Sequence, residues 1–227
     1  MQIKLDQSRR IAGAFLAGAV LLSMSALGNE QPELQQTKLR ELGRQLEIGD
    51  VVFIRIPNAP FTKVAATTSS WTNHVGIVSN VSGAEPMIAE SRVPLSGATT
   101  WTKFVKRSDA GRVAVTRLPE PLDAQQQEKL KQAVAARQNI RYDTGFDLHS
   151  SGQFCSRYVR EVLHDAAGVE LGEVENFSTL LDHNPEADQQ FWKLWYFGQI
   201  PWQRETVTPA SLLRDGRMRV VFDGRAK

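Results

Sequence analysis

The sequence of 227 residues contains a single cysteine, Cys155. One cysteine excludes a disulfide within the chain, and it excludes metal sites built on C-x₂-C pairs. The four histidines are scattered and show no H-E-x-x-H spacing. We therefore expect neither a metal ion nor a cofactor.

Long hydrophobic runs are also lacking. The longest uncharged apolar run, residues 11–22, has 12 residues, whereas a membrane-spanning helix needs about 20. Lys4, Arg9 and Arg10 precede this run, and Ala26 and Gly28 follow it at the −3 and −1 positions of a cleavage site. This pattern predicts a signal peptide over residues 1–28 and a periplasmic or otherwise exported protein. An uncleaved N-terminal membrane anchor is the alternative.

Clusters of positive charge are absent from the rest of the chain. The formal net charge is +2, and it falls to zero when residues 1–28 are removed, because Lys4, Arg9 and Arg10 leave together with Asp6. A nucleic-acid-binding protein needs a basic surface. We expect no nucleic-acid partner.

The chain shows no repeats and no low-complexity linker, which indicates one domain over residues 47–227 after a short surface helix within residues 29–46. β-branched and alternating stretches predict strands, and helix-forming stretches follow them. The predicted strands are 49–57, a hairpin over 74–91, 112–118 and 218–224; the predicted helices are 123–138 and 154–167, with a helical turn within 61–71. This order favours an α+β fold with an antiparallel sheet packed on one face by helices.

Cys155 lies at the start of the predicted helix that ends at Gly168. A cysteine is often a small buried hydrophobic residue, but an unpaired thiol in an exported protein is exposed to oxidation. Unpaired N–H groups at a helix start favour the thiolate, and they can lower a thiol pKa from about 8.5 to roughly 3.5–7.5. Cys155 is therefore a candidate nucleophile.

A thiol nucleophile needs a base, and His74 and His149 are the candidates. His74 begins a rigid β-branched strand, and His149 lies in the loop before the thiol. His164 and His183 fall on a predicted helix surface and in a polar turn. Spacing alone does not choose between His74 and His149.

Glu90 ends the second strand of the hairpin that His74 begins, so the turn would bring the two side chains together. A third polar group of this kind orients the imidazole in nucleophilic enzymes. The alternative is an ordinary charge on an edge strand.

These segments occur in a recognisable order: GDVVFIR, NHVGIV, MIAES, RYDTGF with QFCSRYVREVL, and TPASLLRD with RVVF. Over about residues 47–222 they resemble the permuted papain-like amidases related to the NlpC-type peptidoglycan peptidases, the YaeF/YiiX-like group. In unpermuted relatives the cysteine helix precedes the histidine strand, and here the histidine comes first.

The resemblance implies a circularly permuted papain-like fold, with a small open barrel of antiparallel strands against helices. It implies Cys155 as nucleophile, His74 as base, Glu90 as the residue that orients it, and Tyr142 as a group that polarises the carbonyl. Residues 184–207 have no counterpart in the minimal fold.

That insertion holds six aromatic residues between Phe191 and Trp202. Such a cluster is typical of core packing, and the alternative is an apolar wall over the thiol. We predict that Trp195 belongs to the core and that Trp202, which follows Pro201, lines the substrate cleft.

The leading hypothesis is an exported cysteine hydrolase that cleaves amide bonds of cell-wall peptides through an acyl-enzyme. One alternative is a lipid-directed thiol acyl hydrolase or acyltransferase, and another is a non-catalytic envelope binding protein. Partners would be a small peptide or acylated substrate, with association at the cell wall or a membrane surface.

Overall fold

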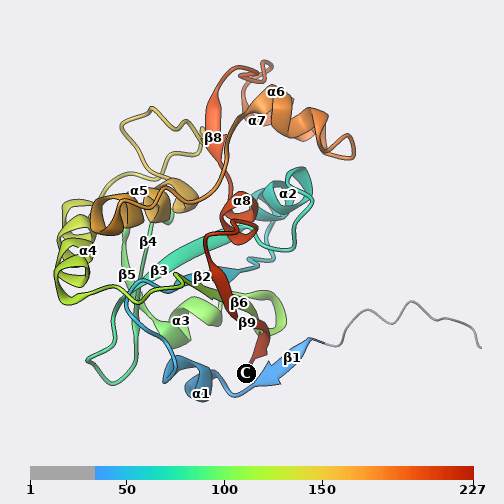
Figure 1. The fold of residues 1–227 in the computed structure, drawn as a ribbon. Helices are drawn as coiled ribbons and strands as arrows, with labels where there is room; N and C mark the ends of the chain where they lie inside the picture. Colours follow the sequence, from blue (N-terminus) through green and yellow to red (C-terminus); the bar gives the residue numbers. More distant parts are fainter. Residues whose placement is uncertain (1–33) are drawn as a thin grey trace, which may run out of the picture. The chain divides into compact units, whose positions relative to one another are not determined.

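The computed structural model describes residues 34–227, and its centre is a seven-stranded open sheet (Figure 1). The strands, in their order across the sheet, are β1 (Gln35–Thr37), β9 (Arg219–Ala226), β6 (Arg112–Arg117), β2 (Val51–Ile54), β3 (His74–Asn80), β4 (Met87–Glu90) and β5 (Gly97–Thr100). All neighbours are antiparallel except β1 and β9, which are parallel. The predicted α+β class, strands and hairpin are confirmed.

Helices cover both faces of this sheet, not one as predicted. In β2, Val51 and Phe53 belong to a core that includes residues of α4 (Ala124–Ala136) and α5 (Cys155–Ala167). The alternate residues Val52 and Ile54 belong to a second core with α1 (Leu39–Gly43) and α3 (Trp101–Val105). Successive side chains of a strand point to opposite faces, so a strand that is apolar throughout needs cover on both sides.

Local signals fix the ends of the two long helices. Asp123 accepts a hydrogen bond from the backbone N–H of Gln126, and the Gln126 side chain accepts one from the backbone N–H of Asp123. This capping box starts α4 at the predicted place. Gly168, with φ of 70°, ends α5 in the left-handed conformation that favours glycine.

The predicted surface helix within residues 29–46 is shorter than expected. Of residues 34–46, the part of this range that the structure describes, residues 39–43 are helical and residues 35–37 form the edge strand β1 against β9. Leu42 and Leu46 are buried in the core that α1 shares with α3. Residues 1–28, the predicted signal peptide, lie outside the described residues. Within residues 34–227 no helix has the length and apolar character to cross a membrane.

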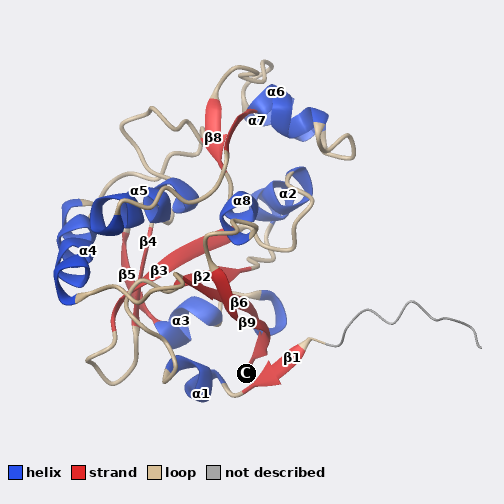
Figure 2. Cartoon of the chain, viewed as in Figure 1, coloured by secondary structure: helices blue, strands red, loops and turns tan. Residues whose placement is uncertain are grey.

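A second, smaller layer follows α5. The two-stranded sheet of β7 (Val174–Asn176) and β8 (Glu205–Val207) carries α6 (Phe177–Asp182) and α7 (Gln189–Trp195), as Figure 2 shows in strand and helix colours. We call residues 174–207 the aromatic cap. It contains its own cluster of buried side chains: Phe177, Leu181, Ala187, Trp192 and Ile200.

The aromatic cap is attached to α2 (Ala59–Thr67), which is a full helix where a helical turn was expected. The Lys63 ammonium lies 2.6 Å from an Asp188 carboxylate oxygen. The Trp192 indole N–H donates to the Thr67 hydroxyl at 2.7 Å. The remaining elements are the 3₁₀ turn η1 (Asp109–Gly111) and α8 (Pro209–Leu213).

Candidate active site

Cys155 is the first residue of α5, as the sequence predicts. Phe154 before it is extended, and no side chain caps this helix start. The apolar stripe of α5, formed by Tyr158, Val159, Val162 and Leu163, is completely buried. Packing of that stripe holds the helix start in place, and the thiol is itself only 3% exposed.

His74 and Glu90 meet across the β3–β4 hairpin. The pairing of Ile77 with Ala89 puts Glu90 two residues from the position opposite His74, on the same face of the sheet. The His74 Nε2 atom lies 2.6 Å from Glu90 Oε2, and both side chains are fully buried. The contact expected between these residues is present.

Arg107, just beyond α3, is a residue that sequence reasoning missed. Its Nη2 atom donates to both carboxylate oxygens of Glu90, at 2.9 and 2.7 Å, and the Nε of Arg92 lies 3.6 Å from Oε1. Burial raises the pKa of the Glu90 carboxyl, but the charges and hydrogen bonds of His74 and Arg107 outweigh it and lower that pKa. No sequence pattern pairs Arg107 with Glu90, because they lie on separate elements.

The thiol of Cys155 and the imidazole of His74 act on each other directly. Burial raises the pKa of the Cys155 thiol, but the His74 charge and its hydrogen bond lower it overall. Burial lowers the pKa of His74, yet Cys155 and Glu90 raise it to about 9. The two shifts favour a thiolate–imidazolium pair at neutral pH.

One ring nitrogen of His74, Nδ1, is not held by Glu90. His74 Nδ1 is buried, and among the described residues it has no hydrogen-bond partner of good geometry. Because Glu90 holds Nε2, Nδ1 is the atom left to exchange a proton with Cys155.

The Tyr142 hydroxyl also lies at Cys155. Burial and the adjacent thiol raise its pKa well above the usual value, and its hydroxyl contacts both the thiol and the backbone of Cys155. The phenol therefore stays protonated and can donate a hydrogen bond beside the sulfur.

The other three histidines are at the surface. His149 Nε2 pairs with Glu205 at 2.6 Å, and its side chain is 70% exposed. His164 and His183 are also exposed, and they lie near Glu170 and Glu175. Of the two bases that the sequence left open, the structure brings His74 and not His149 to the thiol.

A cavity opens above Cys155, between α2, the loop that contains Tyr142 and the aromatic cap. It encloses about 480 Å³, its mouth included. The apolar lining residues are Phe61, Val64, Phe146, Phe154, Phe177, Leu180, Trp192, Val207 and Pro209. No aspartate, glutamate, lysine or arginine side chain lines it.

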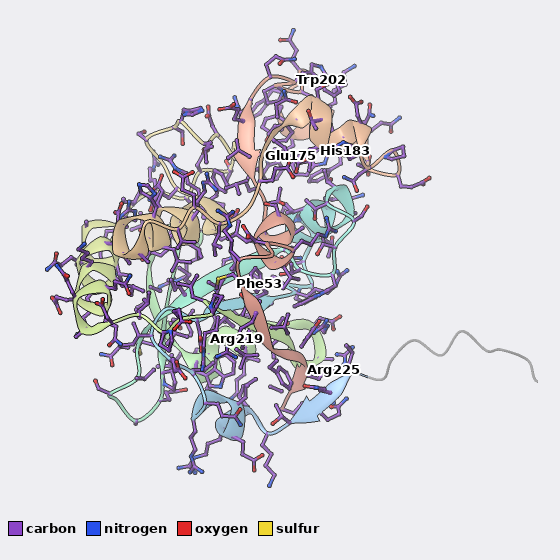
Figure 3. The ribbon with its side chains drawn as sticks, viewed as in Figure 1. Phe53, Glu175, His183, Trp202, Arg219 and Arg225 are labelled. Atoms are coloured by element: carbon purple, nitrogen blue, oxygen red, sulfur yellow. The ribbon has the colours of Figure 1, made fainter. Side chains whose placement is uncertain are left out.

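The prediction that Trp202 lines the cleft is corrected by this geometry. Trp202 is 43% exposed and borders a surface hollow with Gln189 and Lys193; Figure 3 draws it at the outer end of the molecule, far from Phe53 of the core. The tryptophan in the cavity wall is Trp192, which is 3% exposed. Trp195 is half-buried and stacks on Phe191. Trp192 is a buried member of the small core of the cap, and Trp195 packs against that core from its edge.

A family model described as permuted papain-like amidase enzyme, YaeF/YiiX, matches residues 45–222. The chain belongs to this family. It is accordingly an enzyme, a cysteine-type hydrolase of the amidase class, and the match spans both the hairpin with His74 and the helix that begins at Cys155.

Two relatives agree with this membership. The uncharacterized protein YiiX of Escherichia coli strain K12 is 23% identical over 168 residues, which cover 74% of this chain and 82% of the relative. The crystal structure of metalloprotein yiiX from Escherichia coli O157:H7 superposes with a TM-score of 0.72 at 24% identity, covering 79% of this chain and 98% of that one. The superposition establishes the shared fold.

The word metalloprotein in that description belongs to the relative. Within residues 34–227 of this chain, no group of three or more His, Cys, Asp or Glu side chains is arranged to hold a metal ion. Glu90, the carboxylate that contacts His74, is also bound by Arg107. The residues around Cys155 therefore do not fit a metal site.

Proposed function

We propose that this protein is an exported thiol amidase in which Cys155 is the nucleophile, His74 the general base and Glu90 the residue that orients His74. The observation that carries the proposal is the 2.6 Å contact of Glu90 with Nε2 of a buried imidazole, which leaves Nδ1 to the thiol. The signal-peptide pattern of residues 1–28 supports export.

The reaction follows from this arrangement. The Cys155 thiolate attacks the amide carbonyl, and a C–S bond forms while the oxygen takes the negative charge. The backbone N–H at the start of α5 and the Tyr142 hydroxyl would stabilise that oxyanion. The His74 imidazolium gives its Nδ1 proton to the leaving nitrogen, and the C–N bond breaks.

The second half releases the acyl group. Neutral His74 takes a proton from water, and the resulting hydroxide attacks the thioester. The C–S bond breaks, the carboxylic acid departs, and Cys155 and His74 return to the thiolate–imidazolium pair. Glu90 keeps its charge throughout and stabilises the imidazolium.

The cavity favours a substrate with an apolar acyl group. Its lining is mainly aromatic and aliphatic, and each Å² of apolar surface that a ligand buries there contributes about 25 cal/mol.

Three polar side chains in the lining are already hydrogen-bonded within the protein. The Asn73 side chain binds both the N–H and the carbonyl of Ile56. The Thr68 hydroxyl donates to the Val64 carbonyl, and the Ser156 hydroxyl donates to that of Val207. These groups are not free to bind a polar substrate, which again favours an apolar one.

Cell-wall peptides are the second candidate substrate. The kinship with amidases and the predicted export favour them. Such peptides carry carboxylates and ammonium groups, however, and the cavity offers these charges no partner. A lipid-derived N-acyl amide suits the lining better. A non-catalytic binding role is least favoured, because the thiol, imidazole and carboxylate are all in place.

The test compares three substrates with the same enzyme. Products from a short N-acetyl amide, a long-chain N-acyl amide and cell-wall peptides are identified by mass spectrometry, with Cys155→Ser as the inactive control. We expect Cys155-dependent release of the long acyl chain with the highest kcat/KM. Cleavage of cell-wall peptides alone would reject the acyl proposal, and cleavage of none would reject the amidase proposal.

A further inference from the structure

The outer side of the aromatic cap exposes large apolar side chains. Phe197 is 99% exposed, Leu194 79% and Trp202 43%. They belong to one short stretch that runs from α7 towards β8. Such residues are normally covered in a soluble protein, so a group of them on one element indicates an interaction surface. We call these three residues the cap tip.

The backbone at Phe197 has a conformation that is uncommon for its residue type. Phe197 has a φ of 54° and Gly198 a φ of 105°, just after the end of α7. The left-handed region favours glycine and is uncommon for a bulky aromatic residue. The ring is almost fully exposed, so packing against the fold does not account for an aromatic residue at this position.

The stretch that contains the cap tip carries positive charge only. Residues 189–203 contain no aspartate or glutamate, and Lys193 is their only charged side chain. The two surface hollows that residues of α7 line contain no acidic side chain; apart from Lys193 they are lined by glutamines, glycines, a threonine and aromatic or aliphatic residues. A basic, aromatic surface without acidic groups suits the boundary between lipid headgroups and acyl chains.

We propose that the cap tip docks on the surface of a phospholipid bilayer that contains anionic lipids. Phe197, Leu194 and Trp202 would enter the interfacial region, and Lys193 would lie among the headgroups. The use of such docking rests on the proposed amidase function. The inner side of the same cap lines the cavity at Cys155 through Trp192 and Phe177. The same cap would then contact the bilayer through its outer side and the acyl group of the substrate through its inner side.

A bilayer fits this surface better than a second copy of the chain. Stable protein interfaces bury about 800 Å² on each partner and have a well-packed centre. Three apolar side chains beside Lys193 and several glutamines do not supply such an area. Shallow insertion of a few aromatic and aliphatic side chains is, by contrast, enough for reversible binding to a membrane.

A local fluorescence probe tests the docking in the full-length chain. Phe197→Cys is introduced in the Cys155→Ser background and labelled with an environment-sensitive fluorophore. Val220→Cys is the matched control, because Val220 is also an exposed apolar residue, 61% exposed on β9. With phosphatidylglycerol-containing vesicles we expect a blue shift at position 197 and none at 220. The local readout separates the cap tip from any contribution of residues 1–33.

A binding measurement completes the test. We expect the Leu194→Ser/Phe197→Ser double variant to bind these vesicles about tenfold more weakly or worse, since two apolar anchors are lost, and Val220→Ser to bind normally. Lys193→Glu should weaken binding to anionic vesicles most at low salt. Hydrolysis of a soluble short-chain amide should be unchanged in all of these variants.

Two results would overturn the docking proposal. One is aqueous emission at position 197 in the presence of anionic vesicles. The other is a blue shift that grows with protein concentration in the absence of lipid, which would assign the surface to a second copy. A different result would reject the amidase proposal alone. In that case no Cys155-dependent hydrolysis is observed, while the probe at position 197 still responds to vesicles.

Discussion

Arg107 donates from its Nη2 atom to both carboxylate oxygens of Glu90, at 2.9 and 2.7 Å. Glu90 in turn holds His74, so a line of charges runs from the buried Cys155 to a guanidinium that is 33% exposed. In this line each buried charge has a partner of opposite sign, which is the condition under which burial is tolerated. Arg107 is therefore a positioning residue.

Replacement of Arg107 should disturb Glu90 without touching the substrate. We expect Arg107→Ala to lower kcat about tenfold or more, as loss of a charge-assisted hydrogen bond implies, with little change in KM. The pKa of Glu90 should rise, so the acid limb of the kcat/KM profile should move to higher pH. Arg107→Lys should restore part of kcat. An unchanged pH profile in Arg107→Ala would show that the contact of Arg107 with Glu90 has a structural role only.

Loss of either partner of the thiolate–imidazolium pair should abolish hydrolysis. We expect Cys155→Ser and His74→Ala each to lower kcat/KM by about a thousandfold or more, with near-wild-type circular dichroism. His149→Ala is the matched control, because His149 is exposed and pairs with Glu205 at the surface. Activity that survives in Cys155→Ser, or disappears in His149→Ala, would contradict the assignment.

Glu90→Gln should have a milder effect than His74→Ala and should shift the pH profile. Cys155 and, after it, the Glu90 carboxylate raise the pKa of His74 to about 9 against the effect of burial, and the imidazole must be protonated to release the leaving group. Activity of the wild type should thus fall as pH rises through about 9. Without the carboxylate the pKa of His74 is lower, so the alkaline limb should move to lower pH.

The rate of Cys155 alkylation gives an independent check on Glu90→Gln. Alkylation requires the thiolate alone and should not decline at alkaline pH. Coincident alkaline limbs in wild type and Glu90→Gln would show that another group sets the pKa of His74.

Trp192 and Trp202 should respond differently to removal. Trp192→Ala should cost about 3–5 kcal/mol of unfolding free energy and should reduce the preference for long over short acyl chains, since Trp192 is buried in the cavity wall. Trp202→Ala should change stability by less than about 0.5 kcal/mol and leave selectivity for soluble substrates intact. Melting curves and kcat/KM for the paired substrates measure both effects. A loss of selectivity in Trp202→Ala but not in Trp192→Ala would show that Trp202 lines the cleft.

Gly76 is needed beside the candidate catalytic histidine. A Cβ there would lie 2.6 Å from Ile88 Cγ2 and 3.0 Å from Phe104 Cε2, and the Phe104 ring packs against His74 with centroids 5.8 Å apart. We expect Gly76→Ala to cost about 1–3 kcal/mol of stability and to lower activity.

Gly83→Ala in the turn of the same hairpin is the control for Gly76→Ala. Its new Cβ would meet only a backbone oxygen at 3.6 Å, so its melting temperature and activity should match wild type. Equal behaviour of the two variants would show that the space around Phe104 is not critical.

The sequence by itself determined the parts of the site that local patterns carry. The apolar stripe and Gly168 defined α5 and set Cys155 at its start. The alternation of the hairpin placed His74 and Glu90 on facing strands. The order of the motifs identified the permuted family, which the family match over residues 45–222 confirms. These features depend on residues that are close in the chain, so periodicity and turn chemistry are enough to find them.

Only the tertiary structure decided what surrounds that site. Trp192 and Trp202 have the same chemistry and lie ten residues apart, yet one lines the cavity and the other faces solvent. Arg107 reaches Glu90 from another element, and His149, the base that the sequence kept open, pairs with Glu205 instead. In each case the outcome depends on packing between segments far apart in the chain. Two tryptophans or two histidines look alike in a local pattern. Only the packed fold distinguishes the partners that each of them meets.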